Sequence, residues 1–435
     1  MKVRRSVLAS VVGLLGLFLC APAGAGEAPK PTNWGDLFTR PTLLGDWGGT
    51  RTLMAEKGIT FDASVTQTGM GVVDGGTSSA WESGGRGELK GRFDTGKAGL
   101  WPGGFLTAEF EGNWNKSVNL STGALMTADT NRVLPRPFGD NVTLPELLFT
   151  QFVNRYVGVS VGKLETLSPD DPNEFAHGKG DTQFFNLAFN INPVLLMVPY
   201  STLVAGVTIL PTADPQQASI GFAVLSATGD ASTAGFDDIN GAIFSGKGRV
   251  RTGFLGLTGH QVVGACYSNK RYPSIDQRLA EVAQDRLATR SDTWAAYYNF
   301  DQFLYETAKD SRKGIGLFGR FGAGEGNPIP VQYFYSAGVG AKGLIPGRDL
   351  DQFGVGYYYS SINNPTLKTP SATRSALQDE WGFEAYYNVA VTPWLLVTPD
   401  IQVIGGAQKQ QFLGNGQRRI VGDATVVGFR AQVVL

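Results

Sequence analysis

Polar and apolar residues alternate with a period of two in many short segments of this chain. The segment 380–389 has the clearest pattern, because Trp381, Phe383 and Val389 share one face while Glu380 and Glu384 share the other. Successive side chains of a strand point to opposite faces, so one face of such a strand is apolar and aromatic and the other is charged. Repeated roughly sixteen times, this pattern predicts an all-β, transmembrane antiparallel β-barrel with a polar interior rather than a soluble sandwich.

The strands are expected at regular intervals, and a count of fourteen or eighteen stays open. Their expected positions are Thr60–Met70, Arg86–Thr95, Gly104–Trp114, Leu144–Phe152, Tyr156–Glu165, Thr202–Leu210, Ala218–Ala227, Gly248–Thr258, Gln261–Asn269, Asp292–Leu304, Gly314–Gly322, Phe334–Lys342, Asp351–Ser360, Asp379–Val391, Trp394–Ile404 and Ala424–Leu435.

The connections between these segments predict how the barrel is oriented. Long connections, such as 115–142 and 166–201, alternate with short ones, such as Asn154–Arg155 and an apparent two-residue turn at Gly259–His260. Bacterial outer-membrane barrels have short periplasmic turns and long extracellular loops, so both termini are expected in the periplasm. Ahead of the first strand, Thr50–Lys57 with Gly58 after it predicts a short helix.

The N-terminus has the features of a secretory signal. Basic residues precede the apolar run Val7–Leu19, and small residues follow it, so cleavage is expected after Ala23 or Ala25. Cys20 also allows a lipoprotein, although Leu19 stands where such proteins have a small residue. The expected organisation is a signal peptide at 1–25, a periplasmic segment with a short helix at 26–58, and a barrel domain at 59–435.

Composition excludes several classes of protein. After signal removal Cys266 is the only cysteine, so no disulfide within the chain is possible, and no other apolar run is long enough for a membrane-spanning helix. The net charge of −1 argues against nucleic-acid binding. His177 and His260 are the only histidines, and neither belongs to a nucleophilic or metal-binding motif. We therefore expect no enzyme activity, no metal and no cofactor.

Three segments resemble the OprB-type carbohydrate-selective porins. They are Leu43–Asp62 (LLGDWGGTRTLMAEKGITFD), Gly103–Asn115 and Tyr386–Gln402, and the resemblance extends in order and length over the mature chain. It implies a sixteen-stranded porin that passes monosaccharides, glucose above all, without an energy source. The final segment also resembles the signal read by barrel-insertion machinery, except that it ends in Leu435 rather than an aromatic residue.

Charged residues in the predicted strands are expected to face the lumen, because a basic residue facing hydrocarbon at the bilayer midplane costs about 2–4 kcal/mol. Opposite charges at a narrowing would offer donors and acceptors that match sugar hydroxyls. The alternative is that these charges only hydrate the wall. The candidate pore-lining and constriction residues are Glu88, Arg92, Glu109, Glu111, Arg249, Arg251, Arg320, Glu384, Tyr386, Asp400 and Arg430.

The connection 166–201 is the best candidate for a loop that folds into the lumen, because long ordered loops are usually functional. The alternative is an extracellular loop that covers the mouth of the barrel or rests on a neighbouring subunit. The candidate constriction residues in this loop are Asp170, Asp171, Glu174, His177, Lys179, Asp181 and Asn186.

These observations predict a porin of the Gram-negative outer membrane for passive diffusion of small, glucose-like carbohydrates. The expected partners are small sugars, outer-membrane lipid, lipopolysaccharide and the barrel-assembly machinery, with a homotrimer possible and no nucleic acid. Two alternatives remain open: a general-diffusion porin without sugar preference, and a barrel plugged by its own loops with a structural or adhesive role.

Overall fold

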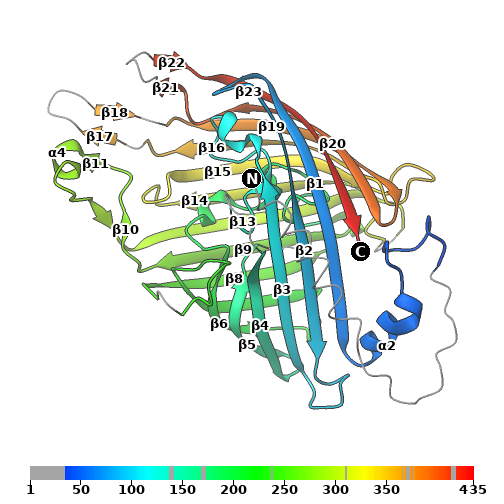
Figure 1. Ribbon diagram of the computed structural model, residues 1–435. Helices are drawn as coiled ribbons and strands as arrows, with labels where there is room; N and C mark the ends of the chain where they lie inside the picture. Colours follow the sequence, from blue (N-terminus) through cyan, green and yellow to red (C-terminus); the bar gives the residue numbers. More distant parts are fainter. Residues whose placement is uncertain are drawn as a thin grey trace, which may run out of the picture.

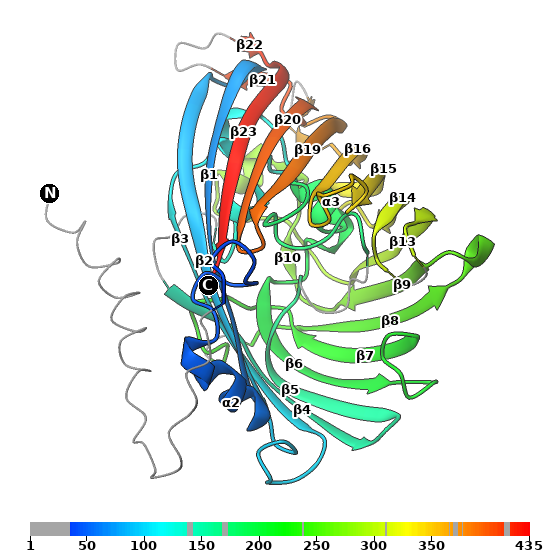
Figure 2. The ribbon, with the colours of Figure 1, turned by 90° about the vertical axis from the view of Figure 1, so that its right-hand side faces the viewer.

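The computed structural model is a closed antiparallel β-barrel (Figures 1 and 2). It describes residues 35–136, 142–167, 173–236, 239–308, 311–364, 366–368, 373–375, 377–412 and 418–435. The predicted signal peptide lies outside these residues. The barrel strands are β1 (Ile59–Gly76), β2 (Ala80–Asp94), β3 (Gly104–Asn115), β4 (Val142–Asn154), β5 (Val157–Glu165), β6 (Ser201–Ile209), β7 (Ala218–Ser226), β8 (Ala242–Thr252), β9 (Gly259–Ser268), β13 (Thr293–Glu306), β14 (Gly314–Gly324), β15 (Val331–Lys342), β16 (Gln352–Ile362), β19 (Glu380–Thr392), β20 (Leu395–Gly405) and β23 (Gly422–Val434).

Each barrel strand pairs with its neighbours in chain order, and the first strand pairs with the last. In this seam between β1 and β23, Ser64 lies opposite Val434 and Val72 lies opposite Val426. Closure leaves no strand edge unpaired, which satisfies the backbone groups that hydrocarbon cannot hydrogen-bond. The sixteen strands found among the described residues confirm the predicted fold.

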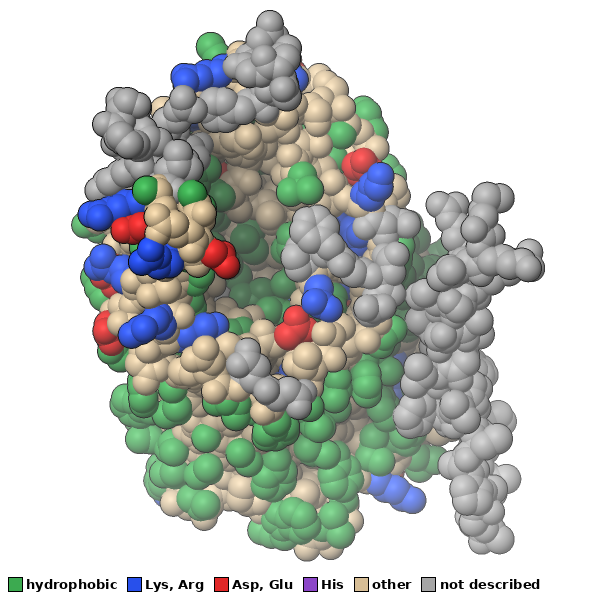
Figure 3. Space-filling model, turned by 60° about the vertical axis from the view of Figure 1, so that its left-hand side comes forward, with side chains coloured by type: hydrophobic (Ala, Val, Ile, Leu, Met, Phe, Trp, Pro, Cys, Tyr) green, Lys and Arg blue, Asp and Glu red, His purple; other side chains and the backbone are tan. Residues whose placement is uncertain are grey.

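The alternation expected in 380–389 is visible in the exposure of β19. Glu380, Gly382, Glu384, Tyr386 and Asn388 are buried, and the residues between them are partly or well exposed. Figure 3 shows the result on one side of the barrel: a band of hydrophobic side chains covers the wall, and charged side chains rim a hollow mouth above it. The outer band is the surface that a bilayer covers.

The two ends of the barrel differ as the connection lengths predict. One end carries short turns, both ends of the described chain, η1 (Trp47–Gly49) and α2 (Thr50–Glu56), which confirms the predicted short helix (Figure 1). The other end carries long connections with small elements of their own. These elements are β10 (Tyr272–Pro273), β11 (Gln277–Arg278), α4 (Leu279–Val282), β12 (Thr289–Arg290), β17 (Thr366–Lys368), β18 (Thr373–Ser375), β21 (Gln410–Phe412) and β22 (Arg418–Ile420). Among the described residues, the helices are too short or too polar to cross a bilayer.

One predicted strand is displaced. The eighth strand was expected at Gly248–Thr258, but β8 spans Ala242–Thr252, and a turn with η5 (Phe254–Gly256) follows it. The apolar residues of this turn look like strand residues in the sequence, although Leu255 is 90% exposed and has a φ of 57°. The two-residue turn expected at Gly259–His260 is therefore wrong, because both residues belong to β9 and His260 is buried beside Asp301.

Candidate pore constriction

The connection between β5 and β6 enters the barrel. We call its described part, residues 173–200, the inserted loop; it contains α3 (Leu187–Asn190) and η4 (Pro193–Leu195). Figure 2 shows α3 within the ring of strands. Phe184, Phe185 and Phe189 are completely buried, and the Phe184 ring packs against Phe318 of β14 and Tyr386 of β19. The loop thus lies against the inner wall of the barrel, and its role as a constriction for solutes stays a prediction.

Glycines on the inner wall make room for the aromatic residues of the inserted loop. A Cβ atom built on Gly340 of β15 would lie 2.5 Å from the Cβ of Phe175, and one on Gly356 of β16 would lie 2.6 Å from the Phe189 ring. A larger residue at either position would push the loop away from the wall. The strand glycines thus leave the space that the aromatic side chains of the inserted loop occupy.

A second loop lies against the inserted loop. We call residues 116–136 the companion loop; it contains η2 (Val118–Ser121) and η3 (Thr130–Arg132). The Thr130 backbone N–H donates to the Phe185 carbonyl at 2.9 Å, and the Leu187 N–H donates to the Thr127 carbonyl at 3.0 Å. The two loops therefore form one hydrogen-bonded unit inside the barrel.

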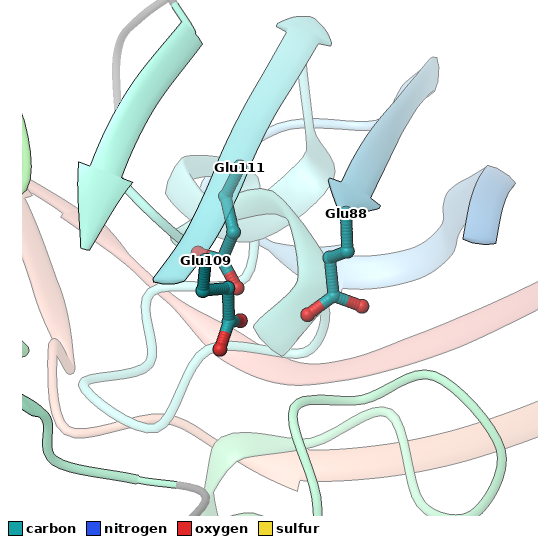
Figure 4. Close-up of side chains that lie close together, drawn as sticks. All are labelled: Glu88, Glu109 and Glu111. Atoms are coloured by element: carbon teal, nitrogen blue, oxygen red, sulfur yellow. The ribbon is translucent and has the colours of Figure 1, made fainter. Parts of the chain in front are cut away.

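Lys179 of the inserted loop meets a group of carboxylates on β2 and β3. Its Nζ lies 2.5 Å from a carboxylate oxygen of Glu88 and 2.5 Å from one of Glu109, and it also pairs with Glu111. Figure 4 shows the three glutamates converging from the two strands. Their oxygens lie within 4.8 Å of one another, a spacing that suits a cation, and here the Lys179 ammonium is the cation among them.

Further charges extend this network. Arg86 of β2 lies 2.6 Å from Asp181 of the inserted loop and 3.0 Å from Glu88. Lys90 bridges Glu109 and Glu146, with both N–O distances at 2.8 Å. Opposite charges from three strands, β2, β3 and β4, and from the inserted loop thus lie within a few ångströms of one another.

Burial and neighbouring charges change the acidity of the loop groups in this network. Burial raises the pKa of Asp181 to about 6, although the Arg86 guanidinium opposes this shift. Burial acts to lower the pKa of Lys179, but Tyr200 and the carboxylate of Glu88 outweigh it and raise that pKa well above its usual value. Lys179 is therefore charged at neutral pH, and Asp181 changes its charge just below it.

Several predicted site residues hold the loop rather than face open space. Glu384 accepts from the backbone N–H groups of Phe185 and Asn186, and Arg430 donates to the carbonyls of Gly180 and Gln183. Arg320 donates to the Ala176 carbonyl. The Tyr386 ring centroid lies 4.8 Å from that of Phe184. The expectation that these four side chains line the open pore is corrected, because the loop occupies the lumen beside them.

The remaining predicted site residues that the structure describes, three in the inserted loop and Asp400 on β20, form hydrogen bonds or ion pairs with other side chains or backbone groups. Asn186 caps α3 by accepting from the Ala188 N–H, and Glu174 pairs with Arg312 at 2.6 Å. The His177 N–H donates to Gln183. Asp400 of β20 accepts from Gln402 at 2.8 Å. Asp170 and Asp171 lie outside the described residues.

Three predicted basic residues lie away from the carboxylate group, towards the end of the barrel that carries the short turns. Arg92 is exposed near the end of β2. Arg249 donates to the Pro215 carbonyl, and Arg251 donates to Thr258 at 3.2 Å. Whether these residues contact a solute stays a prediction.

Sequence reasoning missed several members of the network. Arg86 shares the alternation phase of Glu88, so that phase was the available signal, and Glu146 is a lone charge in an apolar run. Lys247 shares a face with Arg249, but the displaced strand boundary hid it. The contact of Tyr200 with Glu111, at 2.6 Å, has no sequence signal because it depends on the path of the loop.

Comparison with known proteins identifies the family. Residues 79–435 match the model of the carbohydrate-selective porin, OprB family. Porin B of Pseudomonas aeruginosa is 24% identical over 199 residues, a match that spans 41% of this chain and only 41% of that relative. The high-pH structure of Pseudomonas putida OprB superposes with a TM-score of 0.76 at 19% identity, over 92% of this chain and 99% of that one.

The low-pH structure of the same Pseudomonas putida protein superposes with a TM-score of 0.58 at 17% identity. At these identities the two solved structures show a shared barrel fold. The family match and the fold together indicate the Gram-negative outer membrane. The chain belongs to the carbohydrate-selective porins of the OprB family.

Proposed function

We propose that this porin passes small carbohydrates, above all glucose-like monosaccharides, down a concentration gradient. The observation that carries the proposal is the network in which Lys179 meets Glu88, Glu109 and Glu111 while Arg86 meets Asp181. Most of this network is buried, but the side chains of Glu88, Asp181 and Lys90 keep 17%, 16% and 20% of their surface exposed. These side chains present donors and acceptors side by side, which is what a ring of sugar hydroxyls requires.

The same network explains how a neutral polyol can pass without being trapped. A sugar exchanges hydrogen bonds with water for hydrogen bonds with the wall, so its transfer into the narrowing costs little. Binding must stay weak for the solute to leave again. A millimolar Kd corresponds to only about −4 kcal/mol, which a few such contacts supply.

The remaining expected partners belong to the same proposal. The outer band shown in Figure 3 suits contact with outer-membrane lipid and lipopolysaccharide, and the C-terminal strand suits recognition by barrel-assembly machinery. A homotrimer is tested by native mass spectrometry in mild detergent. A single mass at the monomer value would remove it from the proposal.

Liposome swelling tests the function. We expect glucose to enter faster than an uncharged amino acid and a disaccharide by more than size predicts. Glu111→Gln should reduce that advantage, because Glu111 contacts both Lys179 and Tyr200. Glu82→Gln is the matched control, since Glu82 is a partly exposed glutamate near the start of the same strand, β2.

The outcomes separate the alternatives. Entry that follows size alone in every variant would indicate a general-diffusion porin. An absence of both swelling and single-channel conductance, with a correctly folded barrel, would indicate a barrel plugged by its own loops.

A further inference from the structure

Two glutamates of β19 accept hydrogen bonds from the two loops inside the barrel. Glu384 accepts from two consecutive backbone N–H groups of the inserted loop, that of Phe185 at 2.5 Å and that of Asn186 at 2.9 Å. Glu380 accepts in the same way from two consecutive N–H groups of the companion loop, that of Leu125 at 2.6 Å and that of Met126 at 2.9 Å. The same strand therefore holds two loops by the same geometry.

Both glutamates are buried, and Glu380 accepts from two further donors. Glu380 is 0% exposed and also accepts from the Ala407 N–H at 3.1 Å and from the Tyr358 hydroxyl at 2.9 Å. Glu384 is 1% exposed. The backbone N–H groups that these two glutamates accept from are shielded from water, so a donor that lost its carboxyl partner would carry the full cost of desolvation.

Gln402 of the neighbouring strand β20 forms hydrogen bonds with both loops. Its Nε2 donates to the Ala128 carbonyl of the companion loop at 2.9 Å, and its Oε1 accepts from the Asn186 side chain of the inserted loop at 3.1 Å. Arg430 of β23 adds contacts to the carbonyls of Gly180 and Gln183. One patch of wall, on β19, β20 and β23, thus contacts both loops.

We propose that Glu380 and Glu384 form a single clamp that holds both loops in the lumen and so sets the largest solute that the channel passes. The two glutamates are positioning residues: they touch loop backbone, and the loops in turn narrow the pore. Because the loops are hydrogen-bonded to each other, release of one loosens the other. The inference rests on the proposed channel function.

Glutamine is the sharpest substitution at these positions, because it preserves the shape of glutamate. Its amide oxygen accepts one N–H group, but its NH₂ group meets the second donor instead of accepting from it. We expect Glu384→Gln to raise the population of the released, wider state about ten-fold, the factor that corresponds to about 1.4 kcal/mol and lies within the range for leaving a buried donor without an acceptor. Glu380→Gln should act in the same direction.

The experiment measures single-channel conductance in KCl and liposome swelling with a mono-, a di- and a trisaccharide. Both variants should show frequent large-conductance states and admit the trisaccharide, whereas Glu82→Gln should match the wild-type protein. Glu384→Asp keeps a carboxyl group with two acceptor oxygens and should restore much of the size limit. Heat-dependent migration on a gel shows for each variant whether the barrel has formed. If Glu384→Gln does not form a barrel, Glu384→Asp and Glu380→Gln provide the same comparison.

The double variant tests whether the clamp is single. A single clamp has one released state, so both glutamine variants should populate the same large-conductance state, and the double variant should populate it by about the product of the two single factors. Different large-conductance levels in the two single variants would show two independent contacts and overturn the single clamp. Wild-type conductance and size limit in both folded glutamine variants would overturn the clamp altogether, while a wild-type barrel without conductance would instead overturn the proposed function.

Discussion

Asp181 of the inserted loop changes its charge just below neutral pH. With its pKa raised to about 6 by burial, it is ionised at pH 7.5 and mostly neutral at pH 5. Its protonation removes one negative charge beside Arg86 and Glu88, so the narrowing becomes more positive as the pH falls through about 6. We expect cation preference, measured as the reversal potential in a KCl gradient, to decrease over that interval.

Asp181→Asn provides the comparison for this pH effect. Asparagine has no charge to lose, so the variant should already have the lower cation preference at pH 7.5 and should change little down to pH 5. An unchanged pH dependence in this variant would assign the titration to another group.

The inserted loop contributes a positive charge, the Lys179 ammonium, to the carboxylates of the barrel wall. This ammonium is shared among carboxylates of two strands, so Lys179→Met leaves like charges facing one another with no common partner. We expect a stronger preference for cations and a loss of the glucose advantage in swelling assays. Lys97→Met is the matched control, because Lys97 is exposed in the turn after β2. A Lys179→Met channel with wild-type reversal potential would contradict this role.

The strands could be predicted from the sequence because polar and apolar residues alternate with a period of two in each of them. In β19 the alternation places Glu380, Glu384 and Tyr386 inward, as the structure does. The prediction failed at β8, where the exposed turn residues Phe254 and Leu255 resemble a strand that faces lipid.

The roles of inward residues were less predictable than their direction. The phase of Tyr386 indicates that it faces inward, but only the path of the loop shows that Phe184 covers it. The same holds for Lys179, whose partners come from strands that lie far from it in the sequence. Periodicity reports which face a residue occupies, while contacts between a loop and the wall depend on the closed barrel.

The seam of the whole barrel is stabilised by the segment that precedes it. Arg51 of α2 donates to the Phe61 carbonyl at 2.6 Å and to the Leu435 carbonyl at 3.2 Å, so it contacts both β1 and the end of the chain after β23. Loss of these hydrogen bonds in Arg51→Ala should lower the free energy of unfolding by about 1–2 kcal/mol.

Urea unfolding in lipid vesicles, followed by tryptophan fluorescence, measures this change. Arg51 is remote from the constriction, so single-channel conductance should stay at the wild-type value. An unchanged unfolding midpoint would show that the seam does not depend on this segment, and a changed conductance would show that the segment influences the pore.

The contacts of the inserted loop also fix an order of events in assembly. The loop lies between β5 and β6, whereas its contacts from Arg320, Glu384 and Arg430 come from residues 144, 199 and 250 positions further along the chain. The loop therefore cannot settle until the last strand has arrived, and the same strand completes the wall. A partly assembled chain has neither a finished wall nor a narrowed passage. The protection of the cell against leakage through this protein thus begins only when its synthesis and insertion are complete.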